Sequence, residues 1–117
     1  MRVSSQKLNP AVEKDILDIL CQVLTDTRDK AEIKQLLKSF LSRAELLCLA
    51  KRFAIAKYLN DGLSYAEIKR RLKISSATIS QIQEQLAKAP GLRIALEKIM
   101  IDEWAEHWAK KIKSLFG

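Results

Sequence analysis

A cluster of basic residues followed by small hydroxyl residues offers the clearest chemistry in this sequence. Lys69, Arg70, Arg71 and Lys73 directly precede residues 75–81, which read SSATISQ. Cationic side chains can contact phosphate groups, and the unpaired N–H groups at a helix N-terminus also favour phosphate. Small hydrogen-bonding side chains at the start of a helix allow a close approach to nucleobase edges. The segment therefore predicts a surface that binds nucleic acid.

The distribution of charge is compatible with a polyanionic partner. The 117 residues carry a net charge of +7, of which +2 lies in residues 43–62 and +3 in residues 63–88. A localised basic surface attracts polyanions. A basic face that is merely solvated is the alternative, and charge alone does not separate the two.

Residues for catalysis or metal binding are scarce. His107 is the only histidine, and with Glu103 it would supply two metal ligands, which is too few for a site. The chain has no Gly-rich phosphate loop and no Ser/His/Asp arrangement. Cys21 and Cys48 lack a CxxC spacing and lie in apolar runs, so we predict two reduced core residues. We expect no enzyme, no catalytic residues, no metal and no cofactor.

The spacing of apolar residues predicts an all-α fold. No run alternates apolar and polar residues as a half-buried strand would. Helices are predicted over residues 10–25, 30–41, 43–60, 65–72, 76–88 and 91–116. The helix over 43–60 is expected to be central in the core, within a single domain over 1–117 that begins with a disordered tail, 1–9. The N-terminus has no apolar signal region and no apolar run is long enough to span a membrane, so a cytoplasmic protein is predicted.

Capping signals mark the ends of the central helices. Ser42 with Glu45, and Ser64 with Glu67, each have the spacing of a capping box, in which side chains and backbone N–H groups bond reciprocally. Gly62 stands where a left-handed residue would end the helix over 43–60.

The two short helices within residues 64–88 predict a helix-turn-helix. An eight-residue helix is not stable alone, so an apolar seam must hold it against its neighbour. In a helix-turn-helix the first helix lies over the DNA backbone and the second enters the major groove by its N-terminal residues. An ordinary helical hairpin is the alternative. The seam consists of Ile68, Leu72, Ile74, Ile79 and Ile82, and the predicted DNA-binding residues are Lys69, Arg70, Lys73, Ser75, Ser76, Ala77, Thr78, Ser80 and Gln81.

The sequence LSRAELLCLAKRFAIAKYLNDGLSYAEIKRRLKISSATISQIQEQL resembles the Trp repressor family, particularly its YerC/YecD-like branch. The resemblance covers residues 41–92. It implies an all-helical, intertwined homodimer in which each subunit presents one helix-turn-helix to half of a palindromic operator in double-stranded DNA. It also implies that Lys69 contacts the DNA backbone. The base edges and nearby phosphates would be contacted by Ser76, Ala77, Thr78 and Ser80.

Departures from the family bear on its ligand. The tryptophan-responsive members hold the indole between two arginines, with a glycine beside the second. Arg52 matches the first arginine, whereas Gln81 and Ile82 replace the second arginine and the glycine. Glutamine lacks the planar charged guanidinium, and isoleucine adds bulk. The resemblance therefore implies a pocket at Arg52 and Gln81 that does not hold tryptophan, and an unknown small-molecule effector remains open.

These patterns predict a sequence-specific DNA-binding transcriptional regulator, most simply a repressor, that works as a homodimer without tryptophan as corepressor. The alternative is a helical interaction or scaffold protein that binds nucleic acid without sequence preference. The stretch SSATIS favours the regulator, because a scaffold has no reason to keep that surface small and polar.

Trp104 and Trp108 share one helical face and are expected to be buried against the N-terminal helices or a partner subunit.

Overall fold

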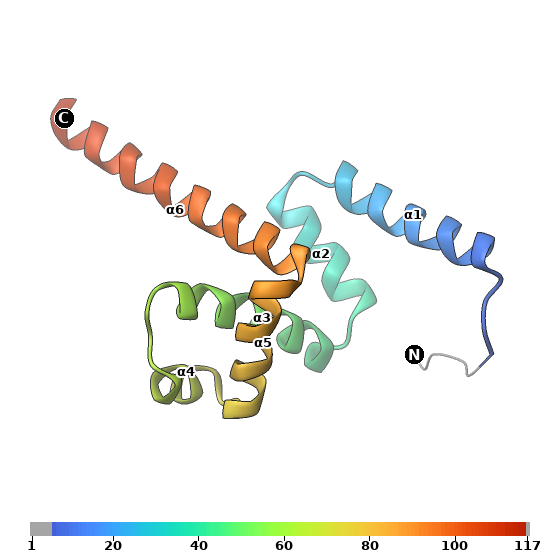
Figure 1. Ribbon diagram of the computed structural model, residues 1–117. Coiled ribbons are helices and arrows are strands. Elements are labelled where there is room, and N and C mark those ends of the chain that lie inside the picture. The colour runs from blue at the N-terminus through green and yellow to red at the C-terminus, as the bar shows by residue number, and fades with distance from the viewer. Residues whose placement is uncertain (1–5, 117) are drawn as a thin grey trace. The chain divides into compact units, whose positions relative to one another are not determined.

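The computed structural model describes residues 6–116, and these residues form helices without any strand (Figure 1). The all-α prediction is confirmed, and each helix boundary lies within one residue of its predicted position. The predicted tail lies partly outside the described residues, and residues 6–9 form no helix. The helices are α1 (Pro10–Asp26), α2 (Lys30–Phe40), α3 (Arg43–Asn60), α4 (Tyr65–Leu72), α5 (Ser76–Lys88) and α6 (Pro90–Phe116).

The chain divides into two compact units, residues 1–46 and 47–117. The first unit contains α1, α2 and the first turn of α3, and the second contains the rest of α3 and α4–α6. The single domain over 1–117 stays a prediction.

The helices of the first unit begin with side-chain caps. Asn9 Oδ1 accepts a hydrogen bond from the Ala11 N–H at 2.8 Å, and the Asp29 carboxylate accepts one from the Glu32 N–H at 3.3 Å. Both bonds satisfy N–H groups that have no partner inside a helix. Within the described part of this unit no side chain is buried. Seven apolar side chains of α1 are each at least 42% exposed: Val12, Ile16, Leu17, Ile19, Leu20, Val23 and Leu24.

The second unit has a small apolar core where α3, α4 and α5 meet. Ile55 and Ala56 of α3 are buried against Ile68 of α4 and against Ile79 and Ile82 of α5. This burial stabilises α4, which is too short to persist alone. The predicted seam is therefore confirmed as a packed cluster. Around it lie the partly buried side chains of Tyr58, Leu59, Leu63, Tyr65, Leu72, Ile74 and Leu86.

One prediction about the core is wrong, and another holds only in part. Cys21 and Cys48 are free thiols, as expected, but both are exposed rather than buried. The helix α3 is central only through Ile55 and Ala56, because its apolar residues are spread around the helix instead of forming one face. Phe53, for example, is exposed.

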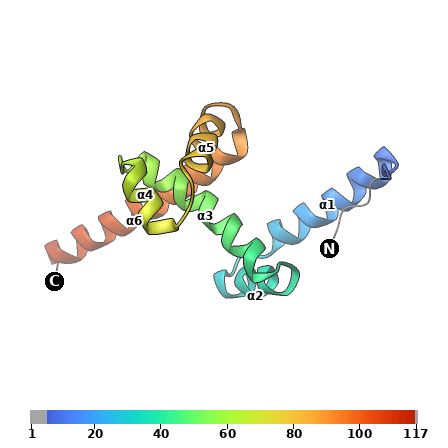
Figure 2. The ribbon, with the colours of Figure 1, turned by 90° about the horizontal axis from the view of Figure 1, so that it is seen from below.

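The apolar side chains of α6 pack on the rest of its unit only as far as Ile99. Leu92, Ala95, Leu96 and Ile99 are half-buried, whereas every described residue after 100 is exposed. Figures 1 and 2 show α6 continuing past α3–α5 as one helix. Trp104 and Trp108 lie in this second half and are exposed in the described chain, so their burial against the N-terminal helices or a partner subunit stays a prediction.

Candidate nucleic-acid interface

The turn between α4 and α5 is built on a left-handed residue. Lys73 has φ 54° and ψ 55°, and its N–H donates to the Lys69 carbonyl at 2.9 Å. This conformation ends α4 and redirects the chain, so that Ile74 packs on the core and Ser75 caps α5. A lysine at positive φ is uncommon, since a Cβ disfavours this region. Gly62, at φ 82°, ends α3 by the same device, as predicted.

The N-terminus of α5 is held by a hydroxyl pair. Ser75 Oγ accepts a hydrogen bond from the Thr78 N–H at 3.2 Å and lies 3.0 Å from Thr78 Oγ1. Ser75 therefore has a local role as the N-cap, whichever ligand the helix meets. The pair also fixes the side-chain direction of Thr78, which is half-buried.

The helix α5 separates its two faces clearly. Ile79 and Ile82 are buried, while the other face of the first turns is exposed. The exposed residues are Ser76, Ala77, Ser80 and Gln81. This face carries no large side chain before Gln81, so another surface can approach the helix closely.

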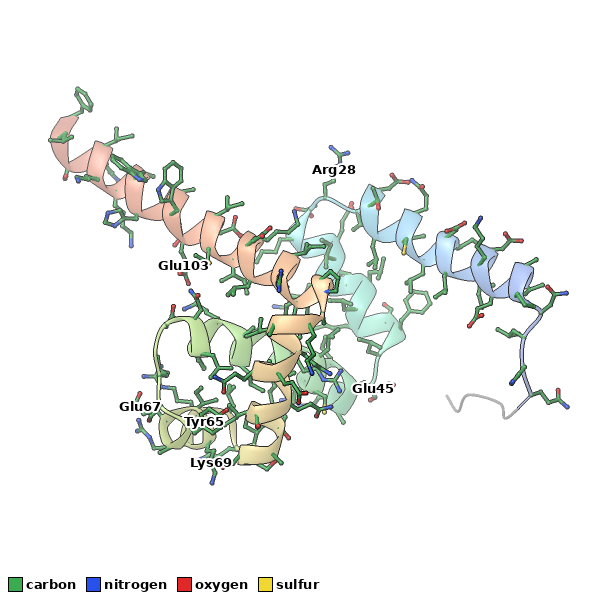
Figure 3. All side chains as sticks on the ribbon, in the orientation of Figure 1. Arg28, Glu45, Tyr65, Glu67, Lys69 and Glu103 are labelled. Atoms are coloured by element: carbon green, nitrogen blue, oxygen red, sulfur yellow. The ribbon has the colours of Figure 1, made fainter. Side chains whose placement is uncertain are left out.

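Basic side chains of α4 and the turn lie beside this exposed helix start. Lys69, Arg70 and Lys73 are exposed, and Figure 3 shows Lys69 pointing outward from α4. Arg71 is used differently, because its guanidinium lies 5.5 Å from the centre of the Tyr58 ring and 3.9 Å from the Glu67 carboxylate. The predicted DNA-binding residues therefore lie between the last turn of α4 and the first turns of α5, whereas Arg71 makes intramolecular contacts.

Two connections fix α5 relative to its neighbours, and neither is predicted from the sequence. The Tyr65 hydroxyl of α4 hydrogen bonds to Gln83 Oε1 of α5. The Arg93 guanidinium of α6 donates to the carbonyls of Leu86 and Ala87, at 3.2 and 2.7 Å, at the end of α5. No local pattern announces the first bond, whereas a basic residue just after a helix C-terminus is a general signal for the second.

A pocket of about 300 Å³ is lined by residues of α3, of α5 and of the turn before α5. Arg52 and Gln81, the predicted pocket residues, both line it, and Ile82 forms part of its wall while almost completely buried. The volume is about that of the smallest common ligand sites. The full lining is Cys48, Lys51, Arg52, Ile55, Ile74, Thr78, Gln81, Ile82 and Gln85.

One lysine joins α3 to α6. Lys57 Nζ lies 2.8 Å from the Asp61 carboxylate and 2.9 Å from the Glu103 carboxylate. Hydrogen bonds to Asp61 and then to Glu103 raise the pKa of Lys57 above its ordinary value.

Among the described residues no three His, Cys, Asp or Glu side chains gather as potential metal ligands. No helix of the described chain has the length and apolar character needed to cross a bilayer.

A short basic helix, a tight turn and a second helix with an exposed N-terminus define the class of helix-turn-helix proteins. Residues 15–100 match the family described as Trp repressor protein. This match covers most of the chain, and the chain belongs to that family. The family consists of DNA-binding regulators and not of enzymes. A comparison with curated proteins found no match to this chain.

Proposed function

We propose that this protein is a sequence-specific transcriptional repressor that acts in the cytoplasm as a homodimer on a palindromic operator. The observation that carries the proposal is the division of α5 into a buried face, Ile79 and Ile82, and an exposed face of small polar residues beside cations. Phosphate contacts by Lys69, Arg70 and Lys73 would position the helix, and Ser76, Ala77, Thr78, Ser80 and Gln81 would read base edges.

The exposed apolar side chains of α1 support the homodimer. Monomeric proteins rarely leave so large a continuous apolar surface in water. A second copy that covers α1 would bury the side chains from Val12 to Leu24 that the single chain exposes. Two helix-turn-helix segments related by a two-fold axis then fit half-sites about 34 Å apart.

Direct titration of DNA tests the proposal. A duplex selected from a random pool should show a palindromic consensus, and its affinity should fall steeply with salt. Lys69→Ala is expected to weaken all duplexes alike, because a phosphate contact carries no sequence information. Thr78→Ala is expected to lose about tenfold on the consensus and little on random DNA, within the range of ~1–3 kcal/mol for a base contact. A pool without a consensus would instead indicate binding without sequence preference.

We further propose that tryptophan is not the corepressor and that the protein belongs to the YerC/YecD-like branch. Gln81 and Ile82 line the pocket, where an uncharged amide and a branched side chain replace a guanidinium and open space. The pocket still has Arg52, Lys51 and two glutamines on its walls, so a different small effector with a negative charge would fit its chemistry. Calorimetric titration with tryptophan is expected to give no binding heat, and micromolar affinity would contradict this part of the proposal.

A further inference from the structure

The outward face of α6 carries an apolar seam that the described chain leaves uncovered. The inward face is identified by the half-buried Leu92, Leu96 and Ile99, and by Glu103, whose carboxylate reaches Lys57 of α3 (Figure 3). We call the α6 seam the residues Ile94, Lys98, Ile101, Ala105, Trp108, Ile112 and Leu115. Its large apolar members are between 42% and 73% exposed.

The spacing of the α6 seam is that of a coiled coil. Successive members are separated alternately by four and three residues, over three heptads. Such a repeat keeps one apolar stripe facing a parallel or antiparallel partner helix. Most of the seam lies beyond residue 100, where the match to the family ends. The regular repeat continues for the whole exposed half of α6, so this half has the pattern of a helix that is covered by another helix.

The distribution of charge along α6 indicates which partner helix would cover the α6 seam. Residues 94–106 contain four carboxylates and one lysine, a net charge of −3, whereas residues 107–116 contain three lysines and no carboxylate, a net charge of +3. An antiparallel copy of α6 would place each acidic half against a basic half. A parallel copy would place like charges together, which is unfavourable.

The sizes of the side chains agree with this arrangement. When the middle of the exposed half is the two-fold centre, Ala105 of one copy faces Trp108 of the other, and Ile101 faces Ile112. A small residue opposite a large one fills space well in a helix pair. Lys98 would face Leu115 at the end of the pair, where its amine can reach water. The Trp108 ring already lies 6.0 Å from Trp104 and 5.2 Å from Lys111 Nζ, which holds it against its own helix.

We propose that α6 pairs in antiparallel orientation with α6 of a second copy of this chain, through the α6 seam. This interface is separate from the DNA-binding face and does not depend on it. A wild-type chain that pairs through α6 but binds no DNA would overturn the proposed function alone, and a wild-type chain that binds DNA but does not pair through α6 would overturn this inference alone.

Charge reversal in the full chain tests the pairing. One variant carries Lys110→Glu, Lys111→Glu and Lys113→Glu, so that both halves of α6 have a net charge of −3. A second carries Glu97→Lys, Asp102→Lys and Glu106→Lys, so that both halves have +3 and the Lys57 partner is kept. By sedimentation velocity at low salt, each variant alone is expected to self-associate at least tenfold more weakly than the wild type, and a mixture of the two is expected to regain association.

The matched control combines all six replacements in one chain. Its halves are again complementary, so association is expected to return, whereas a loss caused by a damaged helix would persist. If α1 of a second copy, whose residues 10–26 have a net charge of −3, covers the seam instead, the first variant would weaken association and the second would strengthen it. That pattern, or unchanged association in both variants, would overturn the proposal.

A distance measurement tests the orientation. A chain with Cys21→Ser, Cys48→Ser and Ser114→Cys would be labelled with a nitroxide at residue 114. In the antiparallel pair the two labelled positions lie fifteen residues apart along the axis, and the distance is expected to be about 25 Å from a rise of 1.5 Å per residue and a helix separation near 10 Å. A distance below about 15 Å would show parallel pairing and overturn the proposal.

Discussion

The apolar side chains of the helix-turn-helix region are buried, whereas those of the long helices α1 and α6 are largely exposed. In α3–α5, the side chains of Ile55, Ile68 and Ile79 are completely buried in a cluster made from one chain. In α1 and in the second half of α6, Leu, Ile, Val and Trp side chains remain exposed although their spacing is regular. Burial of apolar area is the main stabilising contribution to folding, so the first region has its own core, whereas the described chain supplies none for the other two.

This difference implies that the surface proposed to bind DNA and the surfaces proposed to pair two chains form independently. The buried isoleucines fix α5 on α4 within one chain, so the exposed start of α5 needs no second copy to form. The long helices would then set only the spacing between two such surfaces. A DNA-binding surface formed in this way should persist in a monomer, while its affinity for a two-half-site operator should depend on protein concentration.

The largest expected effect comes from removing a core side chain. We expect Ile79→Ala to reduce the free energy of unfolding by about 2–5 kcal/mol, because a buried side chain leaves a cavity. Urea denaturation should show this loss equally at low and high protein concentration. Ile19→Ala, at a position 64% exposed, is the matched variant: its effect should be small in dilute protein and grow with concentration. Concentration dependence in both variants would remove the distinction between the two regions.

Local patterns were enough to place the helices, because their ends depend on neighbouring residues. Ser42 and Glu45, Ser64, and Gly62 all act as their spacing predicted. The contact between Tyr65 and Gln83 could not be predicted, since it joins residues 18 positions apart through the angle between two helices. The exposure of Cys48 was missed because an apolar neighbourhood in the sequence does not determine which side of a helix meets the core.

The site was predictable to a similar extent. The exposed start of α5 and its basic neighbours followed from the basic cluster and the small hydroxyl residues, both of which are local signals. The contact of Arg71 with the Tyr58 ring could not be predicted from the sequence, because Tyr58 belongs to another helix. The left-handed conformation of Lys73 was also not expected, since glycine or asparagine usually takes that position.

The next largest effect is expected at the junction where the packed region passes into α6. Arg93→Ala should lower the free energy of unfolding by about 1–2 kcal/mol, because two carbonyls at the end of α5 lose a charged donor. Arg93→Lys keeps the charge but not the two-pronged geometry, and should recover only part of the loss. Denaturation midpoints measure both variants, and full recovery by lysine would mean that charge alone matters there.

A smaller effect, in the opposite direction, is expected at the turn. Lys73→Gly should be more stable than Lys73→Ala by about 1 kcal/mol, because glycine adopts the positive φ of this position without steric cost. Both variants lose the same charge, so their affinities for DNA should fall equally. Thermal unfolding separates the pair, and equal stability would show that the turn relaxes to another conformation when lysine is removed.

The smallest effect is expected at the start of α3, where hydrogen bonds rather than burial hold the helix. The Glu45 carboxylate accepts from the Ser42 N–H at 2.8 Å, and Ser42 Oγ accepts from the Glu45 N–H at 3.1 Å. The Ser42 N–H, followed by the Ser42 hydroxyl, lowers the pKa of Glu45 below its ordinary value of 4.5. Because the pKa is lower in the folded chain, the charged carboxylate stabilises the fold above pH 4.5, and this contribution is lost as pH falls through the folded pKa.

The variant Glu45→Gln makes this contribution measurable. At neutral pH the wild type should be slightly more stable than the variant, and the difference should shrink as the pH falls below 4.5. Urea denaturation at a series of pH values gives the difference directly. A difference that stays constant down to pH 3 would mean that the capping bond does not depend on the charge of Glu45. The start of α3 would then be held mainly by the uncharged Ser42 hydroxyl, while its other end is held by the burial of Ile55 and Ala56.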